Sequence, residues 1–198
     1  MLTHLRHSEK VLVMRIFITI LVLIFSFQFL AKANDINDFE IEGISIGDSL
    51  LDYYSKDKII NSKLKDQYKS KKFYAISIED NKFENYDAMY FQLKANDNNF
   101  IIYSMSGIID MEINKCLKKR KKIFNSIKTL FDDPIISDEG RREHPAYKNG
   151  YTHDIYIYVN SDFISVSCYE FTDKSRSEEL LISVDTKEFN DFLLDGAH

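Results

Sequence analysis

The densest group of charges in the chain is the run from Lys118 to Lys122. Five consecutive side chains wrap most of the way around a helix, so Arg120 and Lys121 must flank an apolar stripe while the others face water. The lysines are candidate contacts to anionic lipid headgroups or to an acidic partner protein: Lys118, Lys119, Lys121 and Lys122. The alternative is a solvated helix face whose charges pair with acids of the same chain.

Tyr156 and Tyr158 form a second candidate binding surface. They alternate with Ile155, Ile157 and Val159, and this period of two predicts a strand whose tyrosines share the face opposite the aliphatic side chains. Exposed aromatic side chains are enriched at binding interfaces. The alternative is the amphipathic outer layer of a sheet that binds nothing.

Two cysteines, Cys116 and Cys168, can form one disulfide. Each falls on the apolar face of its predicted element, so the helix and the strand would be joined through the core. In the chain-entropy model a bridge across this loop stabilises the fold by about 4 kcal/mol. The alternative is two buried free thiols.

Metal and cofactor chemistry has little support in the sequence. Three histidines, His144, His153 and His198, follow residue 33, and their spacing is not that of a metal site. We therefore expect neither a metal nor a cofactor.

Two short segments resemble the G-D-S-L family of esterases and lipases. Gly47-Asp48-Ser49-Leu50 matches the family signature, and Asp195-Gly196-Ala197-His198 is similar to its D-x-x-H block. The resemblance implies a parallel α/β/α sandwich and a serine ester hydrolase. Ser49 would be the nucleophile, His198 its general base and Asp195 the residue that orients the histidine.

The same letters have a structural explanation, which we favour. Gly47 suits a turn, and Asp48 or Ser49 suits the N-cap of a short helix that begins with Leu50. Near the C-terminus, Gly196 is a typical helix stop.

The N-terminus has the pattern of a signal peptide. Arg15 precedes a run without charge, residues 16–30, and Ala31-Lys32-Ala33 follows as a cleavage box. We therefore expect residues 1–33 to be removed, with translation starting at Met1 or Met14, and the rest to be periplasmic or secreted. No second long apolar run follows, so we expect no transmembrane segment in the mature chain.

The charge balance excludes a dedicated nucleic-acid binder. Residues 34–198 hold 22 basic and 30 acidic residues, a net charge of −8. Binding to a phosphate backbone needs broad positive potential instead. With 15 Phe and 12 Tyr, the chain is aromatic enough for one folded domain, residues 34–198.

Apolar periodicity predicts an α+β fold. Helices are expected from Ser49, over 112–131 and over 185–195, and strands at 73–79, 89–94, 100–105, 155–159, 164–168 and 180–184. Short turns between alternating strands favour antiparallel sheets of about six strands with helices packed on one face. The order is compatible with a diverged duplication of a helix-plus-three-strand unit. Residues 137–150 are expected to be a polar loop.

The segment from Ile41 to Tyr54, IEGISIGDSLLDYY, directly after the signal pattern, is similar to small exported proteins of AT-rich marine alphaproteobacteria. That resemblance implies export and no particular activity. The leading hypothesis is a non-enzymatic envelope protein that binds a protein or lipid partner. The serine esterase is the alternative.

Overall fold

The computed structural model describes residues 35–65, 67–144, 147–173 and 176–195. The chain divides into two compact units, 1–32 and 33–198, and only the second is described below. The predicted signal peptide and His198 lie outside the described residues.

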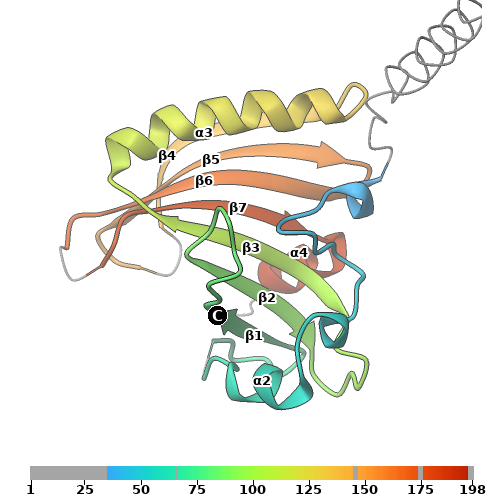
Figure 1. The fold of residues 1–198 in the computed structure, drawn as a ribbon. Coiled ribbons are helices and arrows are strands. Elements are labelled where there is room, and N and C mark those ends of the chain that lie inside the picture. The colour runs from blue at the N-terminus through green and yellow to red at the C-terminus, as the bar shows by residue number, and fades with distance from the viewer. Residues whose placement is uncertain (1–34, 66, 145–146, 174–175, 196–198) are drawn as a thin grey trace, which may run out of the picture. The chain divides into compact units, whose positions relative to one another are not determined.

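A seven-stranded antiparallel sheet forms the centre of this unit, in the order β1-β2-β3-β7-β6-β5-β4 (Figure 1). The strands are β1 (Phe73–Ile78), β2 (Ala88–Lys94), β3 (Ile102–Asp110), β4 (Ile135–Glu143), β5 (Gly150–Val159), β6 (Asp162–Phe171) and β7 (Glu179–Asp185). The helices are η1 (Ile36–Asp38), η2 (Leu50–Asp52), α2 (Lys56–Asn61), α3 (Ile113–Ile127), η3 (Lys128–Leu130) and α4 (Lys187–Leu194). The predicted mixed α+β class and antiparallel pairing are confirmed.

The strand count of about six was wrong, because β4 occupies half of the predicted polar loop. β4 is an edge strand that pairs only with β5, and its side chains are exposed or half-buried on both faces. A strand without a buried face shows no apolar alternation. Its charges and the bulge before Gly140 are typical of a protected sheet edge.

One face of the sheet carries the main core. Its buried side chains alternate along the strands and include Ile157, Ile164, Val166, Leu180, Ile182 and Val184. The N-terminal segment covers this face through residues such as Ile41, Ile46 and Leu50, and α3 covers it through Cys116 and Ile127. The predicted Cys116–Cys168 disulfide joins α3 to β6, with 5.9 Å between the two Cα atoms.

The second face carries α4, so the prediction that all helices pack on one face was wrong. Phe189 and Phe192 of α4 contact Phe73, and Tyr103 of β3 completes this smaller cluster. Both faces of the sheet hold apolar residues at this end. The sequence pattern therefore did not show which face each helix would cover.

Side-chain caps explain where α2 and α4 begin. The hydroxyl of Ser55 accepts a hydrogen bond from the Lys58 backbone at the start of α2. The hydroxyl of Thr186 accepts one from the Phe189 backbone at the start of α4. None of the described helices is long and apolar enough to cross a membrane.

Candidate functional site: the open face of the sheet

The candidate site lies on the face of the sheet opposite α3, which we call the open face. α4 lies behind β2, β3 and β7 in Figure 1, and no described helix covers β5 and β6 on that side. Polar and aromatic side chains occupy much of this face, beside the buried Ile108, Leu181 and Phe163.

A row of hydroxyl side chains crosses the whole open face. The strand registers bring together one residue from each of the seven strands, and every one bears a hydroxyl group. We call this set the hydroxyl row: Ser77, Tyr90, Ser106, Ser183, Ser165, Tyr156 and Ser137. Neighbouring strands lie about 4.8 Å apart, so the row is roughly 29 Å long.

Most of the row is within reach of solvent. Ser165 is 7% exposed, and the other six side chains are half-buried. At the centre, the Oγ atoms of Ser106 and Ser183 share a hydrogen bond of 2.7 Å. Burial raises the pKa of Tyr156 to about 12, so its hydroxyl stays protonated near neutral pH.

The row lies between two borders. On one side, α4 packs over Phe73 and Tyr103. On the other side, the loop between β4 and β5 brings Tyr147 against His144 and Phe171, with ring centroids 4.5 and 5.8 Å apart. Tyr147 also contributes to the raised pKa of Tyr90, after burial and Glu179, and so lies near the row.

The two predicted tyrosines do share this face. The rings of Tyr156 and Tyr158 are 6.1 Å apart, and both contact Phe163. Tyr158 is 36% exposed, and Ile135, its register partner on the edge strand, is 72% exposed. Tyr156 belongs to the hydroxyl row and Tyr158 to the exposed corner beside it.

Carboxylates flank the row on either side. Asp154 is buried and accepts hydrogen bonds from Thr152 at 2.7 Å and Arg142 at 3.0 Å. Burial raises the pKa of Asp185 to about 6, and burial together with Asp110 raises that of Glu179 to about 7. Arg142 also donates to the Tyr156 hydroxyl at 3.3 Å, so its guanidinium is held by two residues of the open face.

The predicted basic run is on the opposite side of the molecule from the open face. Lys118, Lys119, Lys121 and Lys122 are exposed on α3. Arg120 instead lies under the helix with 13% of its side chain exposed, and its Nη2 is 3.9 Å from Asp138. Its Nε and Nη1 atoms are buried without a described hydrogen-bond partner.

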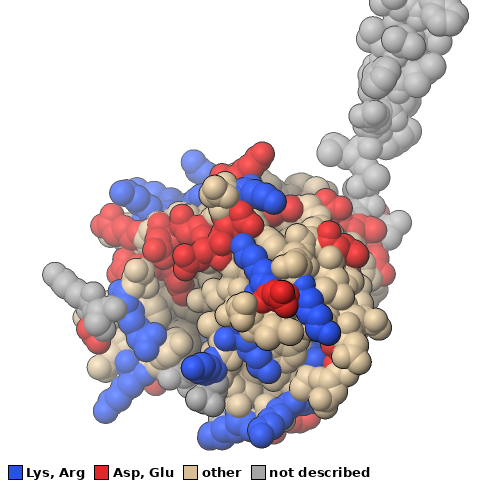
Figure 2. Space-filling model, turned by 60° about the horizontal axis from the view of Figure 1, so that its bottom comes forward, with Lys and Arg blue, Asp and Glu red and all other residues tan. Residues whose placement is uncertain are grey.

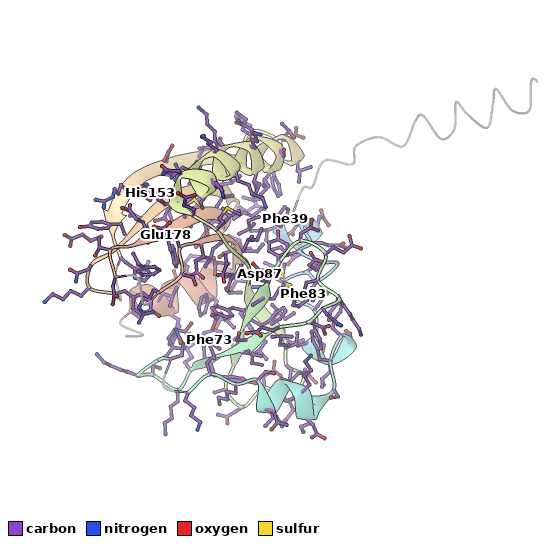
Figure 3. The ribbon with its side chains drawn as sticks, turned by 60° about the vertical axis from the view of Figure 1, so that its left-hand side comes forward. Phe39, Phe73, Phe83, Asp87, His153 and Glu178 are labelled. Carbon is purple, nitrogen blue, oxygen red and sulfur yellow. A yellow bond between two sulfur atoms is a disulfide. The ribbon has the colours of Figure 1, made fainter. Side chains whose placement is uncertain are left out.

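His153 belongs to a charged group on the α3 side. It faces the disulfide, as Figure 3 shows, and its Nε2 is 3.0 Å from Glu170. Arg141 donates to the same carboxylate at 2.9 and 3.2 Å and lies over the ring of Tyr151. These two partners lower the pKa of Glu170 to about 2. All members are paired with one another, which is typical of a structural network.

Ser49 is the N-cap of η2. Its Oγ donates a hydrogen bond to the Asn99 carbonyl at 2.6 Å and accepts one from the Leu51 backbone at 3.3 Å. The hydroxyl proton is thus directed to a carbonyl rather than to a base. Asp195 is the C-cap of α4, and the third member of the implied triad, His198, is outside the described residues. The antiparallel sheet also differs from the parallel sandwich that the G-D-S-L resemblance implies.

Charge is unevenly distributed over the surface. In the view of Figure 2, basic side chains gather at the bottom and acidic ones at the upper left. The segment before β1 is rich in exposed lysines, including Lys65, Lys69 and Lys71. Within the described ranges, no group of three or more His, Cys, Asp or Glu side chains has the arrangement of a metal site.

The hydroxyl row was missed at the sequence level. Alternation does indicate which residues of β5 and β6 face away from the core. The pairing of β3 with β7, which joins the two halves of the row, links residues far apart in the chain. Comparison of the chain with protein-family models, curated proteins and solved structures finds no match.

Proposed function

We propose that this chain is an exported, non-enzymatic binding module of the cell envelope that holds its ligand on the open face of the sheet. The observation that carries the proposal is the contrast between the two faces. One is closed by an apolar core, whereas the other carries polar and aromatic side chains over β5 and β6, where Tyr158 is exposed, Tyr156 is half-buried, and Ser165 and Ser167 are buried. Tyrosine and arginine, which dominate binding energies at interfaces, are both present there.

Export is supported by the signal pattern of residues 1–33 and by the disulfide. Disulfides persist in the periplasm and outside the cell and are rare in the cytosol. A bond between Cys116 and Cys168 inside the core fits a protein that completes its folding after export.

A binding role is supported over catalysis because the hydroxyl of Ser49 and the ring of His153 are both engaged in structural hydrogen bonds. The Ser49 hydroxyl is engaged as a helix cap. His153 is paired with Glu170 on the α3 side, away from the open face. Covalent catalysis usually requires a nucleophile whose hydroxyl is hydrogen-bonded to an oriented base. The Ser49 hydroxyl donates instead to the Asn99 carbonyl.

Site-specific photo-crosslinking in the source organism tests the location of the ligand. A benzoylphenylalanine at Tyr158 on the open face should give a crosslinked product. The same probe at Ile60 should give none, because this residue is 53% exposed on α2, the helix whose Ile59 packs into the main core. Products only from a probe at Lys121 would assign binding to the basic run of α3, and would overturn the proposal.

Fluorophosphonate labelling tests the non-enzymatic part. Oxidised, folded protein should remain unlabelled, as should the Ser49→Ala variant. Labelling of the natural chain that disappears in Ser49→Ala would show an activated nucleophile and favour the esterase.

A further inference from the structure

We propose that the hydroxyl row binds an uncharged glycan chain that lies across the strands. This inference rests on the proposed function, because it names the class of ligand for the same face. Its starting point is the register, which places a hydroxyl-bearing residue at the same level in all seven strands.

The chemistry of the row matches a ligand made of hydroxyl groups. Each Ser or Tyr hydroxyl can donate one hydrogen bond and accept others, and its hydrogen rotates to suit the partner. Sugar hydroxyl groups have the same double capacity. The 2.7 Å bond between Ser106 and Ser183 is a hydroxyl–hydroxyl pair of this kind at the centre of the row, in which either oxygen can donate.

The two tyrosines add flat apolar surfaces one strand in from each end of the row. Tyr90 stands on β2 and Tyr156 on β5, with three serine-bearing strands between them. Both rings are half-buried, and burial raises the pKa of each phenol. Aromatic rings with one apolar body and one polar tip suit a ligand that has C–H faces and hydroxyl edges.

Charge selects among the ligands that carry hydroxyl groups. The carboxylates Asp154, Glu179 and Asp185 border the row. Of the cations nearby, Arg142 is paired with Asp154 at 3.0 Å, and Arg176 lies 3.9 Å from the ring centroid of Tyr147. Negative surroundings repel phosphorylated or uronic-acid chains but accept hydrogen bonds from neutral sugars. The length of roughly 29 Å fits an extended chain rather than a single sugar.

An extended peptide is the competing occupant, and the observations favour it less. Peptides that add to sheets pair with an exposed edge through their main chain. The hydroxyl row runs across the strands, where no backbone groups are free for pairing. The bulged and charged edge strand β4 is also poorly suited to strand addition.

The test is an NMR titration of the oxidised unit 33–198 with chitohexaose, cellohexaose and hexagalacturonate. This unit is compact by itself. We expect at least one neutral hexasaccharide to shift the amide signals of the row, and the anionic one to leave them unchanged. The triple variant Ser106→Ala, Ser183→Ala and Tyr156→Phe should weaken binding at least tenfold.

Two controls keep the result interpretable. The matched variant Ser126→Ala with Thr129→Val removes one hydroxyl group from α3 and one from η3, and should bind as the natural chain does. Removing both partners of the Ser106–Ser183 bond should be nearly neutral for stability, so the melting temperature of the triple variant should change little.

Three results would overturn the inference. These are no binding of either neutral hexasaccharide at millimolar concentration, tighter binding of hexagalacturonate, or binding that the triple variant leaves intact. If crosslinking at Tyr158 still succeeds in those cases, the binding module stands and only the ligand class is wrong.

Discussion

Asp185 should be a destabilising residue at neutral pH. It is 8% exposed, and burial raises its pKa from 3.8 to about 6 despite a hydrogen bond from Ser104. Because the folded state holds this proton more tightly than the unfolded chain does, the free energy of unfolding falls as pH rises from about 4 through about 6. Each pKa unit corresponds to about 1.4 kcal/mol.

Replacing Asp185 with asparagine removes the charge and keeps an oxygen that can accept from Ser104. The pKa difference predicts a gain in unfolding free energy of about 0.5 kcal/mol at pH 4, which grows to about 3 kcal/mol at pH 8. Urea unfolding followed by circular dichroism at these two pH values measures the gain directly. The exposed Asp133→Asn variant is the matched control and should change stability little at either pH.

A variant that loses stability at pH 8, or gains equally at both pH values, would refute this reasoning. The first result would mean that the Asp185 carboxylate is held ionised by groups that outweigh its burial. The second would mean that asparagine improves packing without any electrostatic effect.

Two other perturbations have clear expected outcomes. Cys116→Ala with Cys168→Ala opens a loop with a sequence separation of 52. In the chain-entropy model this lowers the free energy of unfolding by about 4 kcal/mol, which urea unfolding measures against the oxidised natural chain. An unchanged unfolding midpoint would show that packing alone holds α3 on the sheet. Gly107→Ala places a methyl group inside the ring of Tyr86 and should cost about 2 kcal/mol. In the Tyr86→Ala background the ring is absent, so adding Gly107→Ala should restore part of the stability that Tyr86→Ala loses. If the costs of the two substitutions simply add in the double variant, the clash between the new methyl group and the Tyr86 ring is contradicted.

Alternation and helical spacing predicted most of the elements, because burial imposes those periods on the sequence. The strand Ile155–Val159 and the disulfide between Cys116 and Cys168 follow from apolar faces that do pack together. The helix expected over 112–131 is α3 followed by the short η3. The strand expected to end at residue 105 continues to Asp110, since Ser106 and Gly107 lack apolar side chains but pair with β7.

The candidate site was harder to predict, since it depends on register and on the covering of each face. Ser137 lies in a strand whose charges resemble a loop, and Ser183 pairs with Ser106 from the other half of the chain. Neither local propensity nor periodicity encodes such pairing. Tyr156 and Tyr158 could be assigned to one face because they alternate within one strand. The predicted duplication stays a prediction, as the second half has four strands against three in the first.

The central position of the β3–β7 pair has a consequence for the order in which the chain folds. Asp110 pairs with Glu179 and Ser104 with Asp185, so the two halves of the sheet meet only when nearly the whole chain is present. Strand pairing at such sequence separation is slow, because the entropy of closing the loop is lost before the contacts form. During synthesis from the N-terminus, β3 has no β7 to pair with until the last strand emerges. A nascent chain of this topology therefore remains unfolded longest in the part that completes the sheet.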